Sequence, residues 1–170
     1  MARVESYGRL GITLRPEQIQ TFREEAKRKL EEAIRASGKS PADFDIAPIM
    51  PKTDLGLTNE EWKHTFSSAY TEENYVSQTL GDNVFLVLYG YTNHNSTPHT
   101  LYFKLKRNQS VEKVVHVQET FSMDEPYVFF DPVVFSEGDT VTIVLYGNAA
   151  ADDYPVFLGF IAKPKGHILT

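Results

Sequence analysis

The sequence predicts a mainly β protein, an antiparallel sandwich or barrel, preceded by an N-terminal helical region. After Leu80, five or six apolar segments follow one another at intervals of roughly 10 to 20 residues, separated by turn residues and without a helical period. Before Leu80, the segment 16–37 instead repeats its apolar residues at spacings of three and four, which is typical of an amphipathic helix.

Composition narrows the kinds of protein this chain can be. It has 170 residues, 41% of them hydrophobic, a formal net charge of −6 and no cysteine. A chain of this length can bury a core without covalent cross-links. The lack of cysteine excludes disulfides, thiolate zinc sites, iron–sulfur clusters and cysteine nucleophiles. The acidic balance argues against nucleic acid as the main partner, because a phosphate backbone is met by clustered Lys and Arg.

The helix over 16–37 has a start and a stop signal. Pro16 suits a first helical turn, and Gly38 suits the end of the helix. Between them lies an apolar stripe on an otherwise charged segment: Ile19, Phe22, Ala26, Leu30 and Ala33. A second, brief helix is predicted where Ser40 can cap and Pro41 can take the first helical position.

A third helix is predicted over 59–66. Thr58 and Glu61 have the spacing of a capping box, and Leu57 and Trp62 have that of a hydrophobic staple. This assignment makes Trp62 a core residue rather than a platform for ligand stacking.

The strands follow from apolar patterning. Residues 83–91 are apolar on both faces, which is typical of a strand covered on both sides. Residues 100–106 alternate, so one face is buried and one is wet. The remaining strands are expected at 111–118, 127–135, 140–146 and 156–162, with further candidates at 9–14 and 75–80. We therefore expect two parts in what is one structural domain, a helical or extended region over 1–80 and a sandwich over 81–170. The second face of 83–91 is covered either by the helices of 16–66 or by another subunit.

The C-terminal forty residues carry a resemblance to a known superfamily. The segment 134–145 (VFSEGDTVTIVL), followed after a polar loop by 156–161 (VFLGFI), resembles the closing strands of the tumour-necrosis-factor and complement globular-head jelly rolls. In physical terms, Gly138 permits a turn, and the alternating residues after it face a core. The resemblance covers about residues 84–163 and implies a jelly-roll sandwich.

The same resemblance implies association, because members of that superfamily are typically compact homotrimers. Their inner sheets meet through aromatic and aliphatic residues around a threefold axis. In this chain the candidates for such an interface are aromatic residues on strands: Tyr89, Tyr91, Tyr146, Phe157 and Phe160.

These observations predict a non-catalytic, oligomeric structural protein, a capsid, turret or decoration subunit at a virion or particle surface. Its expected partners are further copies of itself, as a trimer, and other particle subunits. The alternative is a carbohydrate- or receptor-binding module, because loops rich in Tyr, Asn and His suit ligand recognition. The candidate ligand residues are Tyr91, His94, His99 and Tyr154.

Catalytic and metal chemistry finds little support in the sequence. His94, His99 and His116 lack the spacing of a cupin-type metal site, so we expect neither a metal nor another cofactor. Neither a nucleophile elbow nor a phosphate-binding glycine loop occurs, and paired acids flank turns. Asn95 and Asn108 begin N-glycosylation acceptor patterns.

Targeting signals are not apparent. The first fifteen residues contain no continuous apolar block of signal-peptide length, and the longest apolar run, 156–162, is far shorter than a bilayer span. We therefore expect no membrane insertion.

Overall fold

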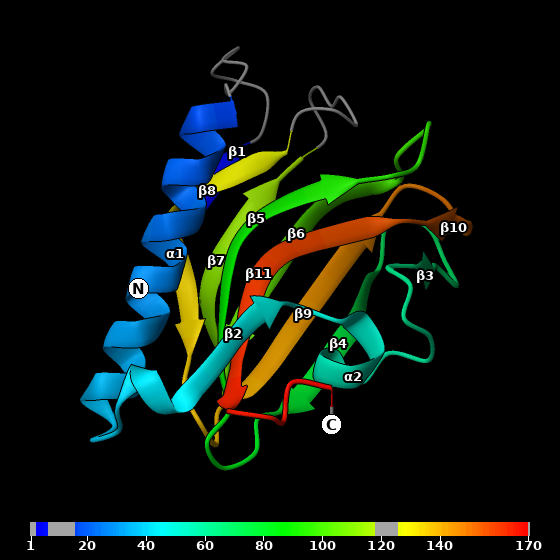
Figure 1. Ribbon diagram of the computed structural model, residues 1–170. Helices are drawn as coiled ribbons and strands as arrows, with labels where there is room; N and C mark the ends of the chain where they lie inside the picture. The colour runs from blue at the N-terminus through cyan, green and yellow to red at the C-terminus, as the bar shows by residue number, and fades with distance from the viewer. Residues whose placement is uncertain (1–2, 7–15, 118–125, 170) are drawn as a thin grey trace.

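The computed structural model describes residues 3–6, 16–117 and 126–169. Two β-sheets lie face to face, and a long helix lies outside one of them (Figure 1). The chain is thus a mainly β antiparallel sandwich with an N-terminal helical region, which confirms the predicted fold class.

The five-stranded sheet has the order β1-β7-β6-β9-β4, with strands at Arg3–Ser6, Ser110–His116, Thr100–Arg107, Thr140–Gly147 and Glu72–Thr79. The four-stranded sheet has the order β2-β11-β5-β8, with strands at Phe44–Pro48, Pro155–Pro164, Phe85–Asn93 and Tyr127–Phe135. Short elements complete the described chain: η1 (Pro41–Asp43), α2 (Pro51–Leu55), β3 (His64–Thr65) and β10 (Asp152–Asp153).

The connections give the sandwich its jelly-roll topology. From β4 onward the chain alternates between the sheets, and only the β6–β7 hairpin keeps two successive long strands in one sheet. This interleaving is typical of a jelly roll. Within the described residues every strand pairing is antiparallel except that of β1 with β7.

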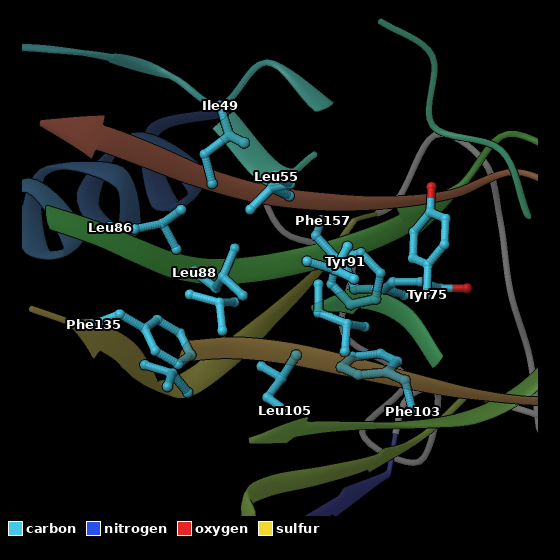
Figure 2. Close-up of a cluster of buried hydrophobic side chains, with 14 of the residues drawn as sticks. Ile49, Leu55, Tyr75, Leu86, Leu88, Tyr91, Phe103, Leu105, Phe135 and Phe157 are labelled. Carbon is cyan, nitrogen blue, oxygen red and sulfur yellow. The ribbon is translucent and has the colours of Figure 1, made fainter. Parts of the chain in front are cut away.

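The main core fills the space between the two sheets. Figure 2 shows side chains of the four-stranded sheet, among them Leu86, Leu88 and Phe157, pointing toward Phe103 and Leu105 of the opposite sheet. All five of these side chains are fully or almost fully buried. The alternation predicted for 100–106 is confirmed, because its inward residues are the ones in this core.

The helix α1 (Pro16–Ala36) builds a second core on the other face of the four-stranded sheet. Its buried residues Ala26, Leu30 and Ile34 pack with Phe85 and Val87 of β5. The strand predicted at 83–91 is therefore covered on its second face by the chain's own helix, not by another subunit. The predicted end of α1 is also confirmed, since Gly38 has a φ of +84°, which favours glycine.

The helix predicted over 59–66 is wrong. Those residues form bends, irregular backbone and the two-residue strand β3, and the helix lies earlier, at Pro51–Leu55. The acid before the predicted capping residue Glu61 binds backwards along the chain: the Glu60 carboxylate accepts hydrogen bonds from the Thr53 N–H (2.8 Å) and hydroxyl (3.0 Å). A free N–H of α2 thus finds its partner in the loop that the sequence pattern assigned to a helix.

Trp62 is partly buried, and its ring centroid lies 6.1 Å from that of Phe157. Its expected place in the core is confirmed, although a loop rather than a helix brings it there.

Residue 80 does not separate a helical part from the sandwich. The first eighty residues supply α1, but they also supply β2 to one sheet and β4 to the other. The strand predicted at 75–80 is confirmed within β4, whereas the one predicted at 9–14 lies outside the described residues. No helix in the described part of the chain is long and apolar enough to cross a membrane.

Candidate functional site

The outer face of the five-stranded sheet is the most distinctive surface of the described structure, and we call it the open face. The helix α1 packs on the opposite, four-stranded sheet, so alternate residues of β6, β7 and β9 on the open face stay half-buried. Strand register places Tyr146 of β9 beside Tyr102 of β6, and Tyr102 beside His116 of β7. The β3–β4 loop adds Tyr70 to one end of this series.

These four side chains, Tyr70, Tyr146, Tyr102 and His116, form what we call the aromatic row. The rings of Tyr102 and Tyr146 are stacked, with centroids 4.5 Å apart and planes 16° apart. His116 lies 5.4 Å beyond Tyr102, and Tyr70 lies 6.2 Å beyond Tyr146. The two inner rings face each other, so the flat surface available to a ligand is at the Tyr70 end.

Tyr70 is presented by a strained backbone. Its φ is +53°, a conformation that a bulky aromatic residue rarely adopts. Its side chain is 64% exposed, and its N–H donates a 2.8 Å hydrogen bond to the Gly147 carbonyl. The loop therefore holds a large aromatic ring in solvent at a conformational cost, which is a recognised sign of function.

Charged groups flank the row. The Tyr102 hydroxyl and the Lys104 ammonium both lie 2.7 Å from the same Glu72 carboxylate oxygen. The hydrogen bond from Lys104, followed by that from Tyr102, lowers the pKa of Glu72. Burial, together with the bond to Glu72, raises the pKa of Tyr102 to about 12. The rim of the row thus holds an anion and a cation, while Tyr102 keeps its proton at neutral pH.

A second carboxylate anchors the loop that carries Tyr70. Glu73 accepts hydrogen bonds from the Ser67 N–H (3.0 Å), the Ser67 hydroxyl (3.0 Å) and the Ser68 N–H (3.2 Å), and it pairs with His64 Nε2 at 3.1 Å. Burial alone would raise the pKa of Glu73, but the hydrogen bonds from Ser67, Ser68 and His64 outweigh it, so the pKa is lowered.

This cluster of serine, histidine and acid is not a nucleophilic triad. The Ser67 hydroxyl donates to Glu73 rather than to the His64 ring, so the imidazole is not placed to act as its base, as a triad requires. Its geometry is that of a loop anchor.

A buried carboxylate ties together the loops at the same end of the sandwich. Asp153 is fully buried, and one of its oxygens accepts from the Asn93 amide (2.9 Å), the Thr100 N–H (2.9 Å) and the Thr100 hydroxyl (2.6 Å). The other oxygen accepts from the Asn95 amide at 3.1 Å. Donors, not a cation, surround this acid, and they fix the 94–99 loop to β10.

The predicted ligand residues are partly brought together. His94 is exposed and donates its backbone N–H to the Tyr154 carbonyl at 3.0 Å, and the His99 ring lies 2.9 Å from the Asn148 side-chain oxygen. Tyr91 is 1% exposed, its hydroxyl accepts from the Asn93 amide, and burial raises its pKa. The assignment of Tyr91 to a ligand loop is therefore wrong, because no ligand can reach it without unfolding.

The predicted oligomer interface also needs correction. Tyr89 and Phe160 stack on each other beneath α1, and Tyr91 and Phe157 lie between the sheets. All four are less than a tenth exposed, so none can contact a second subunit. Only Tyr146 reaches the surface, in the aromatic row.

The sequence led us to expect no metal centre. Among the described residues, no group of three or more His, Asp or Glu side chains could hold a metal ion. His94 and His99 lie in the loops at the end of the sandwich, whereas His116 lies on the open face. The amides of Asn95 and Asn108, the two candidate glycosylation acceptors, are engaged with Asp153 and Asp139.

Sequence reasoning missed Tyr70, Tyr102 and His116. The alternation in 100–106 already puts Tyr102 on the wet face, and the same test applied to 140–146 does so for Tyr146. The adjacency of Tyr102, Tyr146 and His116 depends on which strands pair. The exposure of Tyr70 depends on the conformation of its loop. Local sequence patterns predict neither of these.

Comparisons with known proteins add little. No protein-family model and no curated protein matches the chain. A pilus protein of Bacillus endospore appendages, described as forming disulfide-linked pili, is 17% identical, with 71% of this chain and 86% of that chain covered at a TM-score of 0.31.

Two carbohydrate-binding modules are also similar. A family 36 module in complex with calcium and xylotriose is 15% identical, with 68% of this chain and 97% of that chain covered at a TM-score of 0.34. A family 35 module from Clostridium thermocellum is 16% identical, with 72% and 92% covered at a TM-score of 0.29. At these TM-scores the likeness says nothing of function.

Proposed function

We propose that this protein is a non-catalytic recognition module that binds a saccharide at the Tyr70 end of the open face. The observation that carries the proposal is Tyr70 itself, a solvent-exposed aromatic ring held at a φ of +53° at the end of the aromatic row. Strain of this kind persists only where the surrounding structure enforces it, here through Gly147 and the Glu73 anchor.

The chemistry around Tyr70 suits a sugar. The C–H face of a sugar ring packs on an aromatic ring, while the ring hydroxyls need hydrogen-bond donors and acceptors nearby. The Glu72 carboxylate and the Lys104 ammonium provide both, next to Tyr102 and Tyr146.

The test is a glycan array followed by calorimetric titration of the best ligand. The variant is Tyr70→Asn, because asparagine tolerates the left-handed backbone that Tyr70 adopts and the loop should keep its shape. We expect at least a tenfold loss of affinity with unchanged or slightly higher thermal stability.

Leu169→Ala is the matched control, since Leu169 is the other large hydrophobic side chain exposed in the described structure. It should bind as the parent does. An array without binding, or full affinity in Tyr70→Asn, would contradict the proposal.

A second candidate is a homo-oligomeric subunit of a virion or particle surface, a trimer as the resemblance to the tumour-necrosis-factor and complement-head superfamily implies. It is favoured by the same exposed aromatic surface, because interfaces are enriched in tyrosine. If a second copy covers Tyr70, Tyr70→Asn lowers the molecular mass measured by light scattering. A monomer at all concentrations would argue against this candidate and leave saccharide binding standing.

A further inference from the structure

The strand β1 differs from every other strand of the described sandwich. It is four residues long and pairs in parallel with β7, where Val4 lies opposite Val114 and Ser6 opposite His116. All other described pairings are antiparallel. Apart from the two-residue strands β3 and β10, they join strands longer than β1. Since parallel pairing is slightly weaker per residue, β1 is held by a small number of modest bonds.

The edge beneath β1 has one protective feature, the buried charge of Lys113, but it lacks the proline or bulge that other edges of this sandwich have. The edge strand β8 contains Pro132, β2 ends at Pro48, and β4 carries a bulge between Asn74 and Val76. Each of these devices discourages pairing with a foreign strand. The sequence of β7, SVEKVVH, has no proline and three valines, and no bulge interrupts its pairing with β1.

We propose that β1 is an exchangeable strand, and that the β7 edge accepts residues 3–6 of a second copy of this chain. The occupant is argued from the pairing itself, because an identical strand from a neighbour makes the same contacts in the same register. Reciprocal exchange keeps every strand pairing of the two separate copies, so the exchanged pair loses no hydrogen bond.

The length of the connecting chain limits the geometry. Nine residues separate Ser6 from Pro16, where α1 begins, and they span at most roughly 35 Å. An exchanged pair must therefore bring the β7 edge of each copy close to the start of α1 in the other. Exchange competes with pairing inside one chain, so its extent rises with protein concentration.

The lack of cysteine allows a direct test, because engineered thiols are the only ones present. Val4→Cys and Val114→Cys place one thiol in each of two chains at positions that are opposite in register. The two purified variants, of different mass through a tag, are mixed, oxidised mildly and separated without reductant. We expect a covalent heterodimer at least tenfold more abundant than in a mixture of Val4→Cys with Leu169→Cys, with a yield that rises with concentration.

The proposal is overturned if the mixture gives no more heterodimer than the control at any concentration, while the double variant Val4→Cys/Val114→Cys closes its bridge within single chains. Ser6→Cys with His116→Cys is a second pair in register, for use if Val114→Cys does not fold. Adding Tyr70→Asn to both chains should leave the heterodimer yield unchanged. This last result separates strand exchange from saccharide binding and from association through the open face.

Discussion

Tyr91 shows how one aromatic residue can be misassigned from sequence. It is the last residue of the predicted strand 83–91 and precedes a polar loop, yet its ring centroid lies 4.8 Å from that of Phe103 in the main core. We expect Tyr91→Ala to lower the free energy of unfolding by about 3 to 5 kcal/mol, because it leaves a cavity the size of a ring. Urea denaturation measures this change. Tyr154→Ala, at a half-buried position beside His94, should have a much smaller effect.

The buried carboxylate of Asp153 should contribute measurably to stability through the hydrogen bonds that it accepts. Asp153→Asn replaces an acceptor of four hydrogen bonds by an amide whose NH2 group, in either orientation, meets a donor, that of Asn95 on one side or those of Asn93 and Thr100 on the other. The expected loss is about 2 to 3 kcal/mol in the free energy of unfolding. The neighbouring, exposed Asp152 serves as the control, and Asp152→Asn should change the urea midpoint little. An equal effect of both substitutions would contradict the conclusion that the buried Asp153 fixes the 94–99 loop to β10.

At the scale of an element, the β3–β4 loop should depend on pH. The folded pKa of Glu73 lies below its unfolded value of about 4.3, so its hydrogen bonds stabilise the fold above that pH. This contribution is lost as the pH falls through the folded pKa. We expect the free energy of unfolding to decline between about pH 5 and pH 3, and the decline to be shallower in Glu73→Gln. Denaturation curves at several pH values measure both slopes, and identical slopes would rule out this role.

The elements also show where sequence reasoning succeeds. The helix α1, the alternation in β6 and the turn at Gly138 depend on neighbours a few residues away, and all were predicted. The helix predicted over 59–66 does not form, and within that segment the Glu60 carboxylate accepts a hydrogen bond from the Thr53 N–H of α2. A capping pattern shows that an acid could close a helix at that point, but not that the neighbouring residues will form one.

The candidate site was harder to predict than the fold for the same reason. The aromatic row joins residues from β6, β7, β9 and a loop, so it exists only once strand order is set. The alternation in 100–106 correctly places Tyr102 on the wet face, whereas Tyr89 and Phe160, predicted at an oligomer interface, are buried beneath α1. The difference lies in which sheet α1 covers, which local patterns do not contain.

For the molecule as a whole, α1 and the sandwich should unfold together. The helix buries Leu30 and Ile34 against the same sheet that forms one wall of the main core, and Lys39 just beyond it pairs with Glu137 at 2.5 Å. Leu30→Ala should lower the thermal midpoint of the helix and strand signals equally, by an amount corresponding to about 2 to 5 kcal/mol. Circular dichroism and intrinsic fluorescence record the two signals.

Arg28→Ala, on the exposed side of α1, is the control and should leave the midpoint nearly unchanged. Two separate transitions in the parent protein would show instead that α1 melts independently of the sheets.

The place of β11 also has a consequence for biosynthesis. This strand is the last of the sandwich to be translated, yet it lies between β2 and β5 in the middle of the four-stranded sheet and contacts α1. Until β11 has been translated, β2 has no neighbouring strand in its sheet. The sheet surface on which the apolar stripe of α1 packs is also incomplete. The four-stranded sheet therefore cannot form completely until residue 164 has emerged from the ribosome. During that interval, chaperones can bind the exposed apolar surface of the nascent chain.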